Sequence, residues 1–249
     1  MPTLTDESRF PYTTPEHDVI DAITTGDALH PSTNVFFASR NLPRSVSFAR
    51  CPSLQEALLR MEEDSSLLLA RIGEGRISTE LQLRCSEFPD PLLMLAIVSF
   101  DIPDVVGVLP LWNQMANSCP RAELRIVTDE EMPLLERILN SDSPLDLDAL
   151  EMPLLLLLDE EFHVQAQWGP RPLAAERYIE EWLARHPDFE SQAEDESPEG
   201  SAAFAALTLD LTQYMRIWYN STLDAESSVE LERLLASLQG EPEGNGAEE

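Results

Sequence analysis

Thiol chemistry in this chain would have to use Cys51, Cys85 or Cys119, which are its three cysteines. Neighbouring cysteines stand 34 residues apart, so none forms a pair at the spacing of a redox motif or a zinc site. The residues that flank them share no pattern, which argues against a repeat. We therefore predict three small thiols in the core or at the surface, without a disulfide scaffold and without a bound metal or cofactor.

Carboxylates at Asp101 and Asp104 are candidates for acid–base chemistry or for a divalent cation site. A structural interpretation is favoured, in which Asp104 caps a helix and Asp101 is a solvated loop residue. The acidic segment Asp159 to Glu161 lacks the spacing of a calcium loop and is interpreted as a turn. No glycine-rich phosphate loop is present. The histidines have no Ser, Cys or His partner at motif spacing, and they are His17, His30, His163 and His186. No catalytic residue is predicted.

Arg171 and Trp168 lie in the segment Trp168-Gly169-Pro170-Arg171-Pro172. Two prolines restrict the backbone around Arg171, which then either holds an anionic group of a partner or pairs with a nearby carboxylate and fixes the following helix. The second interpretation is favoured. Trp168 is either a contact residue for a partner or an anchor in the core, and its place at a strand end leaves both open.

The charge of the chain restricts its partners. Asp and Glu number 46 against 16 basic residues, all of them arginine, and the net charge is −30. Such a field repels phosphate backbones and anionic lipids, so neither nucleic acid nor a membrane is an expected partner. Two origins remain open, namely a GC-rich genome with a solubilising surface, or halophilic adaptation to concentrated salt. The longest apolar run, Pro91 to Phe100, is half the length of a membrane span, and the start of the chain is acidic, so a cytoplasmic location is expected.

The first 90 residues divide into an arm and a helical extension. Residues 1–50 are rich in Pro, Thr, Ser and Asp and predict a loosely ordered arm with one short helix from Pro15 to Ile23. Residues 51–90 form the extension, because apolar residues recur there at helical spacing. Two or three helices are expected in it, the last from Thr79 to Phe88.

Residues 91–187 alternate between strand and helix patterns and predict one α/β domain. Apolar runs predict strands, and amphipathic segments predict helices, one of which opens with a capping box at Thr128 and Glu131. The order is strand, helix, strand, helix, two strands joined by a hairpin, and helix. A single mixed sheet with helices on both faces satisfies this order. The strands are expected at 92–100, 122–127, 153–158 and 162–168, and the helices at 105–118, 131–139 and 172–185.

The end of the chain is predicted to be helical between two acidic segments. Residues 188–200 are interpreted as an acidic linker, 201–239 as two helices, and 240–249 as a disordered acidic tail. The second helix is expected to open with a capping box at Ser227 and Glu230.

The central unit resembles the thioredoxin-like superfamily over roughly residues 90–187. Pro110 lies in the predicted helix after the first strand, where thioredoxins carry a helix-kinking proline. Met152-Pro153 precedes an apolar strand, where the family places its cis-proline. The Trp-Gly-Pro-Arg-Pro segment from Trp168 is similar to the signature of a bacterial thioredoxin-like subfamily. Counting back from Pro110 puts Ile102-Pro103-Asp104-Val105 in place of the family's Cys-x-x-Cys motif.

Because Ile102 and Val105 carry no thiol, the redox cycle of the family cannot run through these two side chains. The resemblance then implies a redox-inactive module that binds a protein, a peptide or a second copy of itself in the groove beside the degenerate motif. The open alternatives are a thiol–disulfide oxidoreductase that uses Cys85 or Cys119, and a structural or oligomerisation protein. The groove is expected to consist of Ile102, Asp104, Val105, Met152, Pro153, Trp168 and Arg171.

Overall fold

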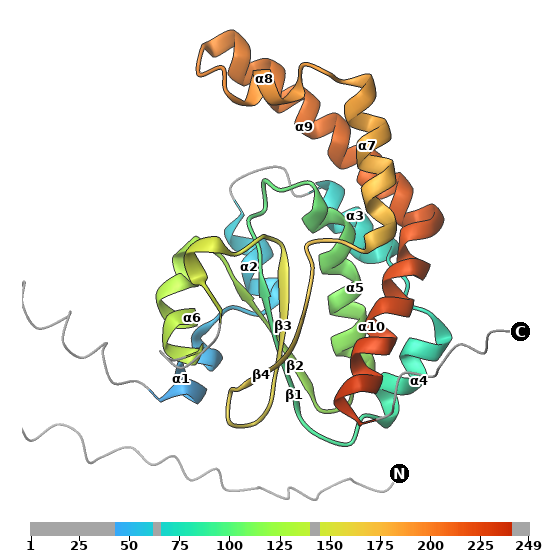
Figure 1. Ribbon diagram of the computed structural model, residues 1–249. Helices are drawn as coiled ribbons and strands as arrows, with labels where there is room; N and C mark the ends of the chain where they lie inside the picture. The colour runs from blue at the N-terminus through green and yellow to red at the C-terminus, as the bar shows by residue number, and fades with distance from the viewer. Residues whose placement is uncertain (1–42, 62–65, 140–144, 241–249) are drawn as a thin grey trace, which may run out of the picture. The chain divides into compact units, whose positions relative to one another are not determined.

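The computed structural model describes residues 43–61, 66–139 and 145–240 (Figure 1). The helix expected from Pro15 to Ile23, with most of the predicted arm, lies outside the described residues. The same holds for the predicted tail after Gly240.

A four-stranded sheet in the order β2-β1-β3-β4 forms the centre of the fold. Strand β1 (Leu92–Ile97) pairs in parallel with β2 (Ala122–Val127) and antiparallel with β3 (Leu154–Leu158), and β3 pairs antiparallel with β4 (Val164–Trp168). The predicted mixed sheet with its terminal hairpin is confirmed. All five leucines of β3 are buried, because an inner strand of a sheet that is covered on both faces has no solvated side.

Helices cover the two faces of the sheet, and each face has its own hydrophobic cluster (Figure 1). Met94 and Ala96 of β1 belong to the cluster that contains α5 (Asp104–Ser118). Leu95 and Ile97 belong to the cluster on the other face, with α1 (Arg44–Arg50) and α6 (Met132–Leu139). Alternate residues of a strand point to opposite faces, so the apolar run of β1 supplies both clusters. The helix after β1 and the helix after β2 thus lie on opposite faces.

The predicted helical extension consists of α2 (Leu54–Arg60), α3 (Ser66–Glu74) and α4 (Thr79–Glu87). Helix α1 precedes it and lies inside the segment that was expected to be a loosely ordered arm. Ser53 and Glu56 form a capping box at the start of α2. Just before it, the carbonyl of Pro52 accepts a hydrogen bond from the amide of Ile126 at 2.8 Å, which covers the free edge of β2.

The predicted capping box at Thr128 and Glu131 is confirmed, and it opens a short 3₁₀ turn (Asp129–Glu131) that leads into α6. A second 3₁₀ turn (Leu147–Ala149) lies ahead of β3, and a third (Leu173–Ala175) leads into α7 (Glu176–Arg185). Residues 172–185 are therefore helical almost as predicted.

The segment 188–200, predicted as an acidic linker, holds α8 (Phe189–Ala193) and the first turn of α9 (Pro198–Trp218). Aromatic contacts explain the difference. Phe189 meets the ring of Trp182 edge-on at 5.2 Å and lies 5.3 Å from the ring of Phe204. Phe189 therefore docks the short helix against α7 and α9.

The predicted capping box at Ser227 and Glu230 is wrong. A π-helical turn (Tyr219–Leu223) joins α9 to α10 (Asp224–Leu238), so the helical backbone continues and no new helix start is needed there. Ser227 is buried inside α10, and Glu230 bonds to groups near the end of β4 instead. No helix in the described ranges is long and apolar enough to span a membrane.

Candidate partner-binding groove

The start of α5 occupies the place predicted for the degenerate motif. Helix α5 begins at Asp104 after Pro103, and the amide of Val105 donates to the carbonyl of Ile102 at 3.1 Å. Ile102 is half-buried, whereas Val105 is 1% exposed. The two positions at the head of the helix thus hold aliphatic side chains, with neither a nucleophile nor an ionisable group.

Asp104 and Arg171 form a two-point ion pair at the head of α5. Nη2 of Arg171 donates to Oδ2 of Asp104 at 2.9 Å, and Nε of Arg171 lies 2.9 Å from Oδ1. The Asp104 side chain is 5% exposed and that of Arg171 is 30% exposed. Burial raises the pKa of Asp104, and the charge of Arg171 opposes that rise. The pairing predicted for Arg171 is found, but Asp104 is not the cap residue that was predicted, because the N-cap position of α5 is Pro103.

A groove of about 720 Å³ opens above this ion pair. Ile102, Asp104, Val105 and Arg171 lie on one side of it, and the other side is formed by α7, α8 and α9. Leu209 of α9 is 53% exposed at its margin. The remaining apolar lining includes Met61, Leu67, Leu68, Phe100, Phe189 and Phe204. The helices that follow the thioredoxin-like unit therefore convert the head of α5 from an open surface into the floor of a largely apolar groove.

The other three predicted residues lie away from this groove. Pro153 is buried directly before β3, and its peptide bond with Met152 is cis. Met152 packs against the cluster on the face of α6, whereas Ile102 packs against the cluster on the face of α5. Of the four residues expected to form one apolar patch, Ile102 and Val105 line the groove, whereas Met152 and Pro153 do not.

Trp168 is a core anchor and not a groove residue. It is 8% exposed, and its ring meets Trp112 of α5 edge-on with centroids 6.0 Å apart. Its Nε1 donates to Oε2 of Glu230 at 2.9 Å, which ties the end of β4 to α10. Its burial and this contact favour the anchor in the core over the contact residue for a partner.

The backbone after Trp168 requires a glycine at position 169. Its φ is +143°, and a Cβ at this position would lie 2.4 Å from the carbonyl oxygen of Pro153. The following bond, Gly169-Pro170, is also cis. The segment from Trp168 to Arg171 thus contacts α10, the Pro153 loop and the head of α5 in turn.

The cysteines lie away from the groove. All three are buried and none forms a disulfide, and no thiol lines the groove in the part of the chain that the structure describes. The thiols of Cys85 and Cys119 share a hydrogen bond. This bond, together with burial, raises the pKa of Cys85, while accepting it lowers the pKa of Cys119. Burial raises the pKa of Cys51 to about 12. Buried thiols of this kind pack as small apolar groups.

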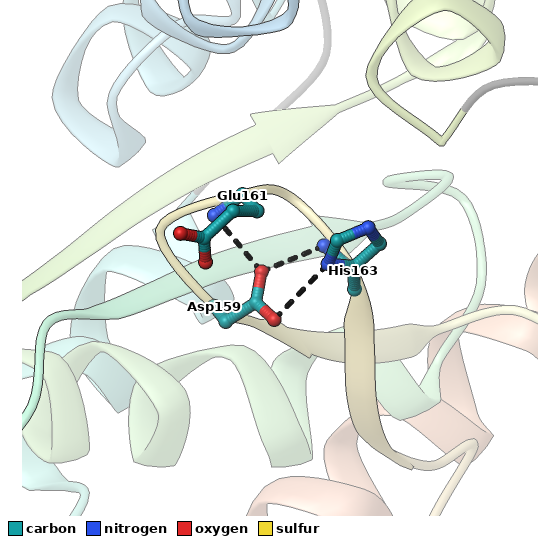
Figure 2. Close-up of side chains that lie close together, drawn as sticks. All are labelled: Asp159, Glu161 and His163. Atoms are coloured by element: carbon teal, nitrogen blue, oxygen red, sulfur yellow. Dashed lines mark hydrogen bonds and ion pairs between the residues drawn. The ribbon is translucent and has the colours of Figure 1, made fainter.

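Asp159, Glu161 and His163 lie within reach of one ion in the β3–β4 connection (Figure 2). The carboxylate of Asp159 is already engaged there, because Oδ1 accepts from the amides of Glu161 and His163, each at 2.9 Å. Oδ2 accepts from the side-chain amide of Gln165 at 2.7 Å. These bonds close the hairpin, in agreement with the interpretation of this segment as a turn.

The fold and the groove define a thioredoxin-like protein with no cysteine at the head of α5, the helix that follows its first strand. A family model described as thioredoxin matches residues 51–183, more than half of the chain, and the chain belongs to this family.

The remaining comparisons say nothing about function. No curated protein matches the chain. Among solved structures, a protein of unknown function from Pseudomonas aeruginosa is 14% identical, with a TM-score of 0.47, and the match covers 79% of this chain and 99% of that one. An HIV epitope-scaffold is 15% identical, with a TM-score of 0.42, and the match covers 69% of this chain and 96% of that one. Function must therefore be argued from the groove of this chain.

Proposed function

We propose that this protein is a redox-inactive thioredoxin-like module that binds a segment of a partner protein in the groove above Asp104 and Arg171. The observation that carries the proposal is the position of the groove, whose floor is the helix head where thioredoxins hold their reactive thiol. Here Ile102 and Val105 replace both cysteines, and aliphatic and aromatic side chains line the volume of about 720 Å³. A space of this size suits several side chains of an inserted segment.

The charges of the groove support an apolar occupant. The Asp104 carboxylate is neutralised by Arg171, which leaves the exposed Asp101 as the remaining charged residue in an otherwise largely apolar lining. Leu209 contributes exposed apolar surface that is continuous with the apolar lining of the groove.

Two exposed residues of α9 give a matched test. Leu209 lines the groove and is 53% exposed, whereas Ile217 does not line it and is 59% exposed. Leu209→Asp should weaken the binding of apolar peptides selected from a display library by about tenfold or more, since a carboxylate would face an apolar ligand. Ile217→Asp should leave binding unchanged. Fluorescence anisotropy with the full chain measures both, and equal binding by the two variants would contradict the proposal.

The oxidoreductase alternative has one observation in its favour, namely the contact between Cys85 and Cys119. The two thiols are 0% and 5% exposed, however, and Cys119 follows the C-terminal end of α5, where the helix dipole disfavours a thiolate. Reduction of insulin disulfides that disappears in Cys85→Ser or Cys119→Ser would establish this alternative against the proposed binding function.

A further inference from the structure

The groove is continued by a smaller pocket at one end of the sheet. This second pocket has a volume of about 250 Å³, enough for one long side chain, and it shares Met61 and Phe100 with the lining of the groove. The two spaces are therefore neighbours that share these two side chains. A ligand in an extended conformation can place one side chain in each.

The second pocket lies where the fold itself creates a crevice. Its lining includes Val98 and Ser99, which follow β1, and Thr128 and Asp129, which follow β2. These two parallel strands are adjacent, and the helices that follow them, α5 and α6, lie on opposite faces of the sheet. The loops diverge at such a point, and ligands of open α/β sheets bind in the crevice that results.

The charges in this pocket are unbalanced. Three carboxylates, Asp129, Glu130 and Glu131, line it against the single guanidinium of Arg60. Arg60 is already engaged, because its Nη1 lies 2.9 Å from Oε1 of the buried Glu131. The other oxygen of Glu131 accepts from the hydroxyl of Thr128 at 2.7 Å. Asp129 and Glu130 are exposed and have no ion-pair partner within the described ranges.

We propose that the groove and this pocket bind one partner segment, with an apolar side chain in the groove and an arginine or lysine a few residues away in the pocket, facing Asp129 and Glu130. This assignment rests on the proposed function and adds the chemistry of the partner to it. Charge complementarity is the argument for the basic residue, since an apolar groove ends in uncompensated carboxylates.

The test uses the full chain and three fluorescein-labelled decapeptides. Each peptide carries a central Leu-Phe pair in a Gly-Ser background, followed by an arginine, a glutamine or a glutamate a few positions along. The arginine peptide should bind about tenfold more tightly than the glutamine peptide at ~20 mM KCl, and this preference should shrink at ~300 mM KCl. The glutamate peptide should bind most weakly.

Variants that lack the carboxylates of the pocket show whether the preference for the arginine peptide arises there. The double variant D129N/E130Q should reduce the preference for arginine to about twofold or less. The matched control E160Q/E161Q removes two exposed acids from the β3–β4 turn, at the opposite end of the sheet, and should keep the full preference. An unfolding curve for each variant verifies that both retain the fold.

The outcomes separate the two proposals. Equal binding of the arginine and glutamine peptides, or an equal loss in both double variants, would overturn the basic pocket and leave the apolar groove in place. A dimer in sedimentation whose formation excludes the arginine peptide would mean that a second copy occupies the site, which also overturns the inference. Failure of every peptide to bind would remove the groove proposal itself.

Discussion

Asp104 is a carboxylate that is almost completely buried in the folded protein, and its ion pair with Arg171 compensates for this burial. The two-point contact places the guanidinium against both carboxylate oxygens, and only the arginine retains substantial contact with solvent. Burial still dominates, because the pKa of Asp104 lies above its ordinary value. The charge on Asp104 therefore depends on a single partner.

Replacing Arg171 by Met should destabilise the protein by about 3 kcal/mol at neutral pH, since it leaves a buried charge unpaired. The pKa of Asp104, already raised, should rise further without the opposing charge of Arg171. A buried acid with a raised pKa binds a proton more readily in the folded state, so the free energy of unfolding falls as pH rises through that pKa. The loss in Arg171→Met should thus be larger at pH 8 than at pH 5, as measured by urea unfolding.

The double variant Arg171→Met with Asp104→Asn provides the control for this pH dependence. An amide cannot ionise. The difference in unfolding free energy between this double variant and the single variant Asp104→Asn should therefore be the same at both pH values. A pH-independent loss in Arg171→Met itself would show that lost packing of the arginine stem, and not the charge of Asp104, is responsible.

The sequence predicts part of this site, for reasons that differ between its residues. The place of Ile102 and Val105 follows from the resemblance, by counting back from Pro110, and in the structure Val105 lies in the first turn of α5 while Ile102 lies two residues before its start. A carboxylate partner could be predicted for Arg171 because two prolines restrict the backbone on either side of it. The positions of Met152 and Ile102 could not be predicted, because they pack on opposite faces of the sheet and this depends on strand order and twist. The groove wall from α9 is missed altogether, since no local pattern shows where a distant amphipathic helix docks.

At the scale of elements, the π-helical turn between α9 and α10 fixes the C-terminal helices against α5. Tyr219, the first residue of the turn, is completely buried, and a Cβ on Gly107 would lie 2.2 Å from its ring. Ion pairs between Arg71 and Asp224 and between Glu74 and Arg216 join the same region to α3. The wall of the groove is therefore attached to the floor through a contact that only glycine allows.

Gly107→Ala and Gly73→Ala form a matched pair of helical substitutions. Alanine is intrinsically better in a helix by about 1 kcal/mol, so a free position should be neutral or slightly stabilised. Gly73 is such a position, because a Cβ added there would have nothing within 4 Å, whereas at Gly107 the buried ring of Tyr219 must move. We expect Gly107→Ala to lose about 2 kcal/mol in urea unfolding. Equal stability of the two variants would contradict the contact.

Periodicity predicts most elements because apolar spacing is a local property. It predicts β2 at the residues that the structure shows, and it places α5 within a residue of its observed start. It misses α8, where the apolar partners of Phe189 come from two other helices, Trp182 of α7 and Phe204 of α9. It also predicts a cap at Ser227, since the pattern alone cannot distinguish a new helix from a π-helical turn that continues an old one.

At the scale of the molecule, the excess of acids is the dominant feature. Among the described residues, Arg60, Arg125 and Arg216 each pair with a neighbouring glutamate, and with 16 arginines in all, most of the 46 carboxylates have no arginine to pair with. Like charges on one folded surface repel one another and favour expansion of the chain. The excess of negative charge therefore lowers the free energy of unfolding, by an amount that depends on the salt concentration.

Raising KCl from ~20 mM to ~1 M should raise the melting temperature by about 5 °C or more, because the screening length falls to roughly 3 Å and the self-repulsion is removed. The same series near the sequence pI of about 4.2 provides the control, since the net charge is close to zero there and the repulsion is absent. A melting temperature that rises only at neutral pH would favour adaptation to salt. A melting temperature that does not change with KCl at neutral pH would instead favour the other origin, in which the acids make the surface soluble and a GC-rich genome accounts for arginine in place of lysine.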